Sequence, residues 1–150
     1  MDIQRFTRER IHDVLAFETA LRAEEADWGW TIDDAYLESV RRSFDDPRFD
    51  HSLSLLAYVD GMVVGRVDST LICSRFDGSV KAYLDWICVL KGHRHQGVAQ
   101  ALMQALRTEL RSLYGIDTLI GLIAGNAEAQ RFYRALPKAN IRDEGIWIDC

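Results

Sequence analysis

The sequence predicts a single α/β domain with a mixed sheet over residues 1–150. Two features of the pattern indicate it. Apolar runs of strand length are interspersed with stretches whose apolar residues recur at helical spacing. Their order is β-α-α-β-β-β-α-β-α-β, and no linker, repeat or low-complexity segment interrupts it. With 48% hydrophobic and 27% charged residues, a chain of this length can also bury one sizeable core.

The first third of the chain predicts a short strand followed by two helices. Residues 2–6 (DIQRF) begin as a strand. Residues 31–44 predict the second helix, with Thr31 as its N-cap and acidic residues in its first turn. The first helix follows from apolar residues near helical spacing at Ile11, Val14, Leu15 and Leu21.

Two turns and three strands are expected next. Residues 52–74 consist of two strand-like runs around Asp60-Gly61, which is a strong hairpin signal. Residues 76–79 (FDGS) predict a second turn. Residues 81–90 (KAYLDWICVL) are apolar almost throughout, as expected for a strand covered on both faces.

The second half of the chain predicts two helices and two strands. Gly115 should end a helix and residues 118–124 should form a short buried strand. Residues 126–136 predict a helix with Asn126 as N-cap, and residues 146–150 a last strand. The helix before Gly115 follows from the spacing of Val98, Ala101, Leu102, Ala105, Leu106, Leu110 and Leu113.

Composition excludes several classes of protein. The net charge of −5 argues against general nucleic-acid binding. The N-terminus has no apolar signal segment and no apolar run nears 18 residues, so we expect no membrane span and a cytoplasmic location. An odd number of cysteines without CxxC spacing argues against a disulfide framework or a zinc site, namely Cys73, Cys88 and Cys150.

A basic turn, residues 91–97 (KGHRHQG), lies between the apolar strand and a helix. The first free N–H groups of a helix and its dipole attract anions. Arg94 can add a charged contact, and Gly97 lets the backbone approach a ligand closely. The turn lacks both a Walker A motif and GxGxxG. It therefore predicts a phosphate-bearing ligand, held by backbone amides, that is neither a P-loop nucleotide nor NAD.

Two motifs in this order resemble the GCN5-related N-acetyltransferases (GNAT). The turn matches the family pattern R/Q-x-x-G-x-G/A, which holds the pyrophosphate of acetyl-CoA, at Arg94, His95, Gln96, Gly97, Val98 and Ala99. The later helix matches N-x-x-A-x-x-F-Y at Asn126, Ala129, Phe132 and Tyr133. Each motif alone is weak, whereas both in the family's order, on the expected elements, are strong.

The resemblance implies a GNAT-like three-layer fold. It has a central mixed, mostly antiparallel sheet that splays between strands 4 and 5 and is flanked by about four helices. The pantetheine chain of acetyl-CoA would lie in the gap, beside Ile87, Cys88 and Val89. The implied activity is direct transfer of the acetyl group to an amine. The Val89 N–H is the candidate for polarising the thioester carbonyl.

Candidate catalytic side chains each have a structural alternative. The resemblance implies that Tyr133 protonates the departing CoA sulfur; the alternative is that it is a core aromatic residue. Asn126 could serve both as the helix cap and as a contact of the cofactor. Asp85, amid apolar neighbours in the strand, would take the amine proton, or it is a salt-bridged or sheet-edge residue. His93 and His95 have no third ligand nearby, so no metal is expected. Cys88 is expected to be a small buried hydrophobe.

The acceptor is predicted to be a small primary amine, such as a polyamine or aminoglycoside. Residues 18–50 hold ten acidic residues against four arginines, a balance of −6, whereas residues 91–114 have a balance of +3. The acidic end with Trp28 and Trp30 would suit a cation, and Asp85 is a further candidate contact of the acceptor. The alternatives are a solvated helical face, a protein amine as acceptor, and a non-catalytic acyl-CoA sensor; a homodimer is left open. Residues 136–149 depart from the family pattern, so its acceptor preferences transfer poorly.

Overall fold

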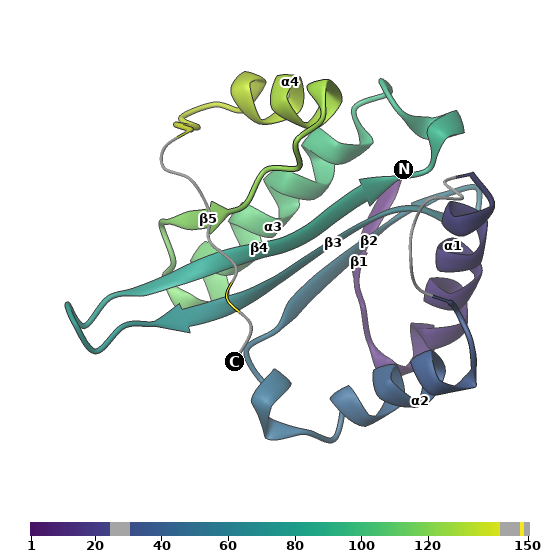
Figure 1. Cartoon of the computed structure of the whole chain (residues 1–150), viewed down its shortest axis with the longest axis horizontal. Helices are drawn as coiled ribbons and strands as arrows, with labels where there is room; N and C mark the ends of the chain where they lie inside the picture. The colour runs from purple at the N-terminus through teal and green to yellow at the C-terminus, as the bar shows by residue number, and fades with distance from the viewer. Residues whose placement is uncertain (25–30, 142–147, 149–150) are drawn as a thin grey trace. The chain divides into compact units, whose positions relative to one another are not determined.

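The computed structural model describes residues 1–24, 31–141 and 148 (Figure 1). It divides into two compact units, residues 1–120 and 121–150. The prediction of one domain over the whole chain stays a prediction. Within the described residues, no helix is long and apolar enough to cross a membrane.

The sheet has five strands in the order β1-β2-β3-β4-β5. The first four pair antiparallel and β5 runs parallel to β4. This mixed, mostly antiparallel open sheet with four helices confirms the predicted fold class. The strands are β1 (Asp2–Arg5), β2 (Leu53–Val59), β3 (Met62–Cys73), β4 (Val80–Val89) and β5 (Leu119–Gly121).

The predicted helices are all present. Short 3-10 turns, η1 (Arg8–Arg10), η2 (Pro47–Phe49) and η3 (Lys91–His93), adjoin them. The predicted cap of the second helix is wrong: the Asp33 carboxylate, rather than Thr31, accepts the Tyr36 N–H at 2.9 Å. Thr31 lies two residues too early to reach the first turn. The α-helices are α1 (Ile11–Glu24), α2 (Asp34–Ser43), α3 (Val98–Tyr114) and α4 (Ala127–Ala135).

Turn chemistry sets the strand register. Asp60 and Gly61 have φ of 49° and 79°, the left-handed values of a tight two-residue hairpin, and they join Val59 to its partner Met62. Gly115, with φ of 65°, ends α3 as predicted. The strand expected at 118–124 is shorter, at three residues. The strand expected at 146–150 lies outside the described residues, apart from Ile148.

Helices cover both faces of the sheet within residues 1–120 (Figure 1). Adjacent residues of a strand face opposite sides. Arg66 faces α1, where it meets Glu18, whereas Gly65 faces α3. A Cβ on Gly65 would come within 3.0 Å of Val98 and 3.1 Å of Leu102, so a larger residue would push α3 away from the sheet.

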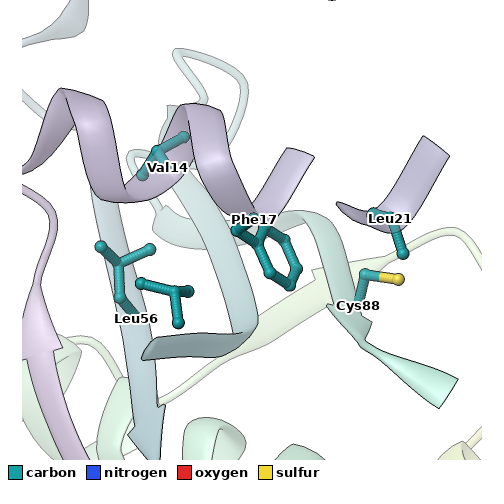
Figure 2. Close-up of a cluster of buried hydrophobic side chains, with 6 residues drawn as sticks. Val14, Phe17, Leu21, Leu56 and Cys88 are labelled. Carbon is teal, nitrogen blue, oxygen red and sulfur yellow. The ribbon is translucent and has the colours of Figure 1, made fainter. Parts of the chain in front are cut away.

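An apolar cluster forms part of the core on the α1 face. Figure 2 shows Val14, Phe17 and Leu21 of α1 gathered over Leu56 of β2 and Cys88 of β4. All five side chains are buried. This packing fixes α1 across the strands and holds the carboxyl-terminal end of β4 in place.

Candidate active site

The turn between β4 and α3 is held by its own side chains. The Arg94 Nε donates to the carbonyl oxygen of Val89 at 2.9 Å, and the Gln96 Nε2 donates to that of Gly92 at 2.9 Å. His95 adopts a left-handed backbone with φ of 59° and is exposed. These contacts give the predicted turn a defined shape at the end of β4.

Gly97 ends the turn and starts α3 with φ of 83°. A Cβ there would meet nothing within 4 Å, so the backbone conformation, rather than crowding in this structure, calls for glycine. Glycine also provides no capping side chain, so the N–H groups at the start of α3 are left for another acceptor. The open space and these donors fit a phosphate group such as the pyrophosphate of CoA.

A second contact joins this turn to α1. The Glu24 carboxylate accepts the Lys91 backbone N–H at 2.8 Å, and the Lys91 Nζ donates to the Glu24 carbonyl oxygen at 2.6 Å. The end of α1 is thereby fastened to the first residue of the turn. Sequence reasoning missed this link because 67 residues separate the two partners.

Along β4, N–H groups two residues apart first point toward β5 and, beyond the irregularity in the strand, toward β3. The Ala82 N–H donates to the carbonyl oxygen of Thr118, next to β5, whereas the N–H of Leu90, directly after β4, donates to the carbonyl oxygen of Val64 in β3. Because N–H directions alternate along a strand, those of Ile87 and Val89 point to the edge away from β3. β5 has only three residues against ten in β4, so it can pair with only part of this edge. By the same alternation, the Cys88 N–H points toward β3.

Asp85 lies at a bulge in β4. Asp68 pairs with Trp86 and Ser69 with Leu84, so Asp85 is the extra residue between the two pairs. Bulges re-aim side chains and occur often beside active sites. Asp85 is exposed, which corrects the prediction that this strand is covered on both faces.

The Asp85 carboxylate forms no hydrogen bond or ion pair with another described residue. Partial burial and the nearby Asp68 carboxylate raise its pKa above the ordinary value, and Arg66 opposes this effect. The salt-bridged alternative for Asp85 therefore finds no partner among the described residues.

Buried charges lie beneath this bulge, and sequence reasoning missed them. Arg66 and Asp68 of β3 face α1, which contributes Glu18 and Arg22. The signal was present in the sequence: two opposite charges at alternate positions of an apolar strand lie on one face. Glu18 is 1% exposed, and its burial raises the pKa of the carboxyl while Arg66 and Arg22 lower it.

Cys88 is a buried thiol. Burial raises its pKa to about 11, so the thiol stays protonated at neutral pH. The side chain packs with Phe17 and Leu21. This agrees with its predicted part as a core residue.

Tyr133 and Asn126 belong to the second unit, residues 121–150. The Asn126 side chain accepts the Ala129 N–H at 2.8 Å, which confirms its predicted N-cap. Tyr133 is half-buried, and its ring meets that of Phe132 edge to face at 5.1 Å. Burial raises the pKa of the Tyr133 phenol, so it carries its proton at neutral pH.

The other residues singled out in the sequence are two tryptophans and a histidine. Trp28 and Trp30 lie outside the described residues. His93, half-buried, ends η3. Across the part of the chain that is described, no three His, Cys, Asp or Glu side chains gather as a metal site.

The sequence itself shows the class of protein, an acetyltransferase. A family model described as the acetyltransferase (GNAT) family matches residues 17–136. The chain belongs to the GNAT acetyltransferase family and is an enzyme of that class. No curated protein matches the sequence.

Solved structures share this fold at low identity. An aminoglycoside acetyltransferase from an uncultured soil metagenomic sample, in complex with sisomicin, has a TM-score of 0.81 at 15% identity; the match covers 99% of this chain and 95% of the other. Aminoglycoside N-acetyltransferase AAC(6')-Iy in complex with CoA has a TM-score of 0.78 at 22% identity, and the match covers 99% of this chain and 93% of the other. A ribosomal-protein-alanine N-acetyltransferase from Brucella melitensis biovar Abortus 2308 has a TM-score of 0.74 at 19% identity, and the match covers 100% of this chain and 99% of the other.

Proposed function

We propose that this enzyme transfers the acetyl group of acetyl-CoA directly to the primary amine of a small, cationic molecule. The observation that carries the proposal is the Asp85 bulge. It presents a carboxylate without a described ion-pair partner on the strand that leads into the phosphate-binding turn. An amine with a pKa near 10 is mostly protonated at pH 7, so a base is needed before it can attack.

The turn at the start of α3 would hold acetyl-CoA. The N–H groups following Gly97 would donate to the pyrophosphate, with Arg94, His95 and Gln96 around it. Ile87 and Val89 have backbone groups at the edge of β4 away from β3, where they could pair with the pantetheine amides. Cys88, between them, would support the strand by packing against Phe17 and Leu21 on the α1 face. Asn126 would serve as a cofactor contact as well as a cap.

Three groups would carry the chemistry. Acetyl-CoA supplies the activated thioester. The Val89 N–H would polarise the carbonyl oxygen, Asp85 would take the proton of the ammonium directly or through water, and the Tyr133 hydroxyl would protonate the departing sulfur. The raised pKa of Asp85 suits a proton acceptor, and the raised pKa of Tyr133 keeps its hydroxyl protonated before the reaction, as a donor must be.

A cationic acceptor is supported by charge and by likeness. Acidic residues outnumber arginines ten to four in residues 18–50, and Asp85 adds an exposed carboxylate. Several solved structures of the same fold are aminoglycoside acetyltransferases. Trp28 and Trp30 are proposed to contact the acceptor. A protein N-terminus is the second candidate acceptor, favoured by the likeness to a ribosomal-protein-alanine N-acetyltransferase.

A thiol-release assay tests the proposal. The protein is incubated with acetyl-CoA and a panel of polyamines, aminoglycosides, neutral amines and N-terminal peptides. Thiol release that depends on a polycationic amine, with the acetylated amine identified by mass, is the expected result. Release only with neutral amines or peptides would overturn the acceptor class. Acetyl-CoA binding without turnover on any amine would instead indicate a sensor.

A further inference from the structure

The charges beneath Asp85 form a connected cluster. The Arg66 Nη2 donates to the Asp68 Oδ1 at 2.8 Å, and the Arg66 Nε lies 2.8 Å from the Asp68 Oδ2. The Ser54 hydroxyl donates to the same Asp68 Oδ1 at 2.5 Å. The hydrogen bond from Ser54 on the neighbouring strand and the two contacts with the Arg66 guanidinium therefore hold the Asp68 carboxylate in one place.

The cluster continues into α1. The Arg66 Nη1 donates to the Glu18 Oε1 at 3.1 Å, and the Arg22 Nη2 lies 3.0 Å from the Glu18 Oε2. Glu18, Arg22, Arg66 and Asp68 together carry two negative and two positive charges. Buried charges that balance in this way are tolerated, whereas one left alone is costly. Asp85 is thus an additional negative charge at the side of a neutral cluster.

The pairing of β3 with β4 places this cluster next to Asp85. Asp68 is paired with Trp86, the residue after the bulge, and Arg66 lies with its guanidinium 6.0 Å from the centre of a Trp86 ring. The charged groups that act on Asp85 are Asp68 and Arg66 of β3. Around Arg66 lie Glu18 of α1, which also pairs with Arg22, and Tyr36 of α2, whose pKa is raised by burial and by the Glu18 charge. Asp68 is the nearest acid among them in the strand register.

We propose that Asp68, clamped by Arg66 beside the β4 bulge, is a positioning residue that strengthens Asp85 as the proton acceptor of the reaction. The inference rests on the proposed function of Asp85. A fixed carboxylate beside Asp85 makes its charged form less favourable, so a proton is bound more tightly. The two contacts with Arg66 hold the Asp68 carboxylate in a fixed place beside the bulge, so this effect does not depend on a mobile side chain.

The charges act on Asp85 in opposite directions. Asp68 favours the protonated form of Asp85, while Arg66 favours the ionised form. Asp68→Asn keeps the side-chain shape and an oxygen for Arg66 and Ser54, but removes one negative charge. The Arg66 charge is then less compensated. Both changes should lower the pH at which Asp85 takes up its proton.

The test is a carboxyl titration followed by NMR, with carbon-13-labelled aspartate, in the wild type, Asp68→Asn and a control. Asp85→Asn assigns the signal. The control is Asp46→Asn, whose partner Arg48 is also two residues away but lies in an exposed pair. We expect the Asp85 midpoint to fall by about 1 pH unit in Asp68→Asn and to stay unchanged in the control.

The pH profile of kcat/KM should follow the titration. Its acid limb should move to lower pH in Asp68→Asn, whereas a merely structural loss would lower the melting temperature without moving the limb. An unchanged Asp85 midpoint in folded Asp68→Asn overturns the inference, whatever the activity. A shifted midpoint with an unmoved acid limb upholds the electrostatic effect but removes Asp85 from the proposed reaction. If Asp68→Asn does not fold, Asp68→Ser, which also removes the negative charge and keeps a polar oxygen, takes its place; the Asp85 midpoint should again fall, and no change there overturns the inference.

Discussion

The Arg94 side chain reaches back to the carbonyl oxygen of Val89, five residues earlier, at 2.9 Å, and so joins the proposed phosphate-binding turn to the end of β4. A residue's C=O and N–H share one side of a strand, so this contact lies at the edge where the Val89 N–H is proposed to act. One side chain thereby ties the two halves of the proposed acetyl-CoA site together.

Arg94→Lys should weaken acetyl-CoA binding by about tenfold, which corresponds to losing about 1.4 kcal/mol. Lysine keeps a positive charge but has no Nε–H in the same position. Calorimetric titration with acetyl-CoA measures the change, and Arg107→Lys on α3 is the control. Unaltered affinity in Arg94→Lys would mean that charge alone matters at this position.

Gly97 allows a matched pair of variants. Asn and Asp both tolerate left-handed backbone, and both can cap a helix, so neither Gly97→Asn nor Gly97→Asp should unfold α3. The two differ in one negative charge facing the proposed pyrophosphate site. Gly97→Asp should therefore bind acetyl-CoA at least about tenfold more weakly than Gly97→Asn. Equal affinities for the two folded variants would place the phosphates elsewhere.

Cys88 is predicted to take no covalent part in the transfer. Its pKa of about 11 leaves little thiolate at neutral pH, so alkylation in the folded protein should be slow compared with that of the exposed Cys73. Cys88→Ala should keep kcat within about threefold, with some loss of melting temperature from the smaller side chain. An acetylated Cys88 found by mass spectrometry after mixing with acetyl-CoA would contradict direct transfer.

Tyr133→Phe separates chemistry from packing. The variant removes only the hydroxyl and keeps the ring that meets Phe132. We expect kcat to fall by about 100-fold or more, with acetyl-CoA affinity and melting temperature nearly unchanged. Tyr114→Phe, at the end of α3, is the control. Normal turnover in Tyr133→Phe would make this tyrosine a packing residue.

Much of the fold follows from local sequence signals. Asp60-Gly61 and Gly115 predict a turn and a helix end because few other residues adopt their left-handed backbone. Apolar spacing predicts α3 because one buried stripe is enough to define it. The length of β5 and the cap of α2 were less well predicted, since both depend on which neighbours the chain meets.

Sequence motifs point to the candidate turn, whereas the arrangement of the charged groups around Asp85 could not be predicted from the sequence. The turn from Arg94 to Ala99 is a local pattern and could be found from the sequence. The Asp85 bulge could not, because it results from the register between two strands. The partnership of Glu18 with Arg66 likewise depends on how α1 crosses the sheet, over a separation of 48 residues.

The central claim is that Asp85 accepts the proton of the acceptor amine. The most direct measurement is the ratio of kcat/KM for the wild type to that for Asp85→Asn, followed from about pH 6 to pH 10 on the best cationic amine. At neutral pH the ratio should be on the order of 100 or more. It should shrink steadily toward pH 10, where much of the amine is already free. A ratio that stays constant over this range would contradict the account, because a loss that does not depend on amine ionisation is not the loss of a base.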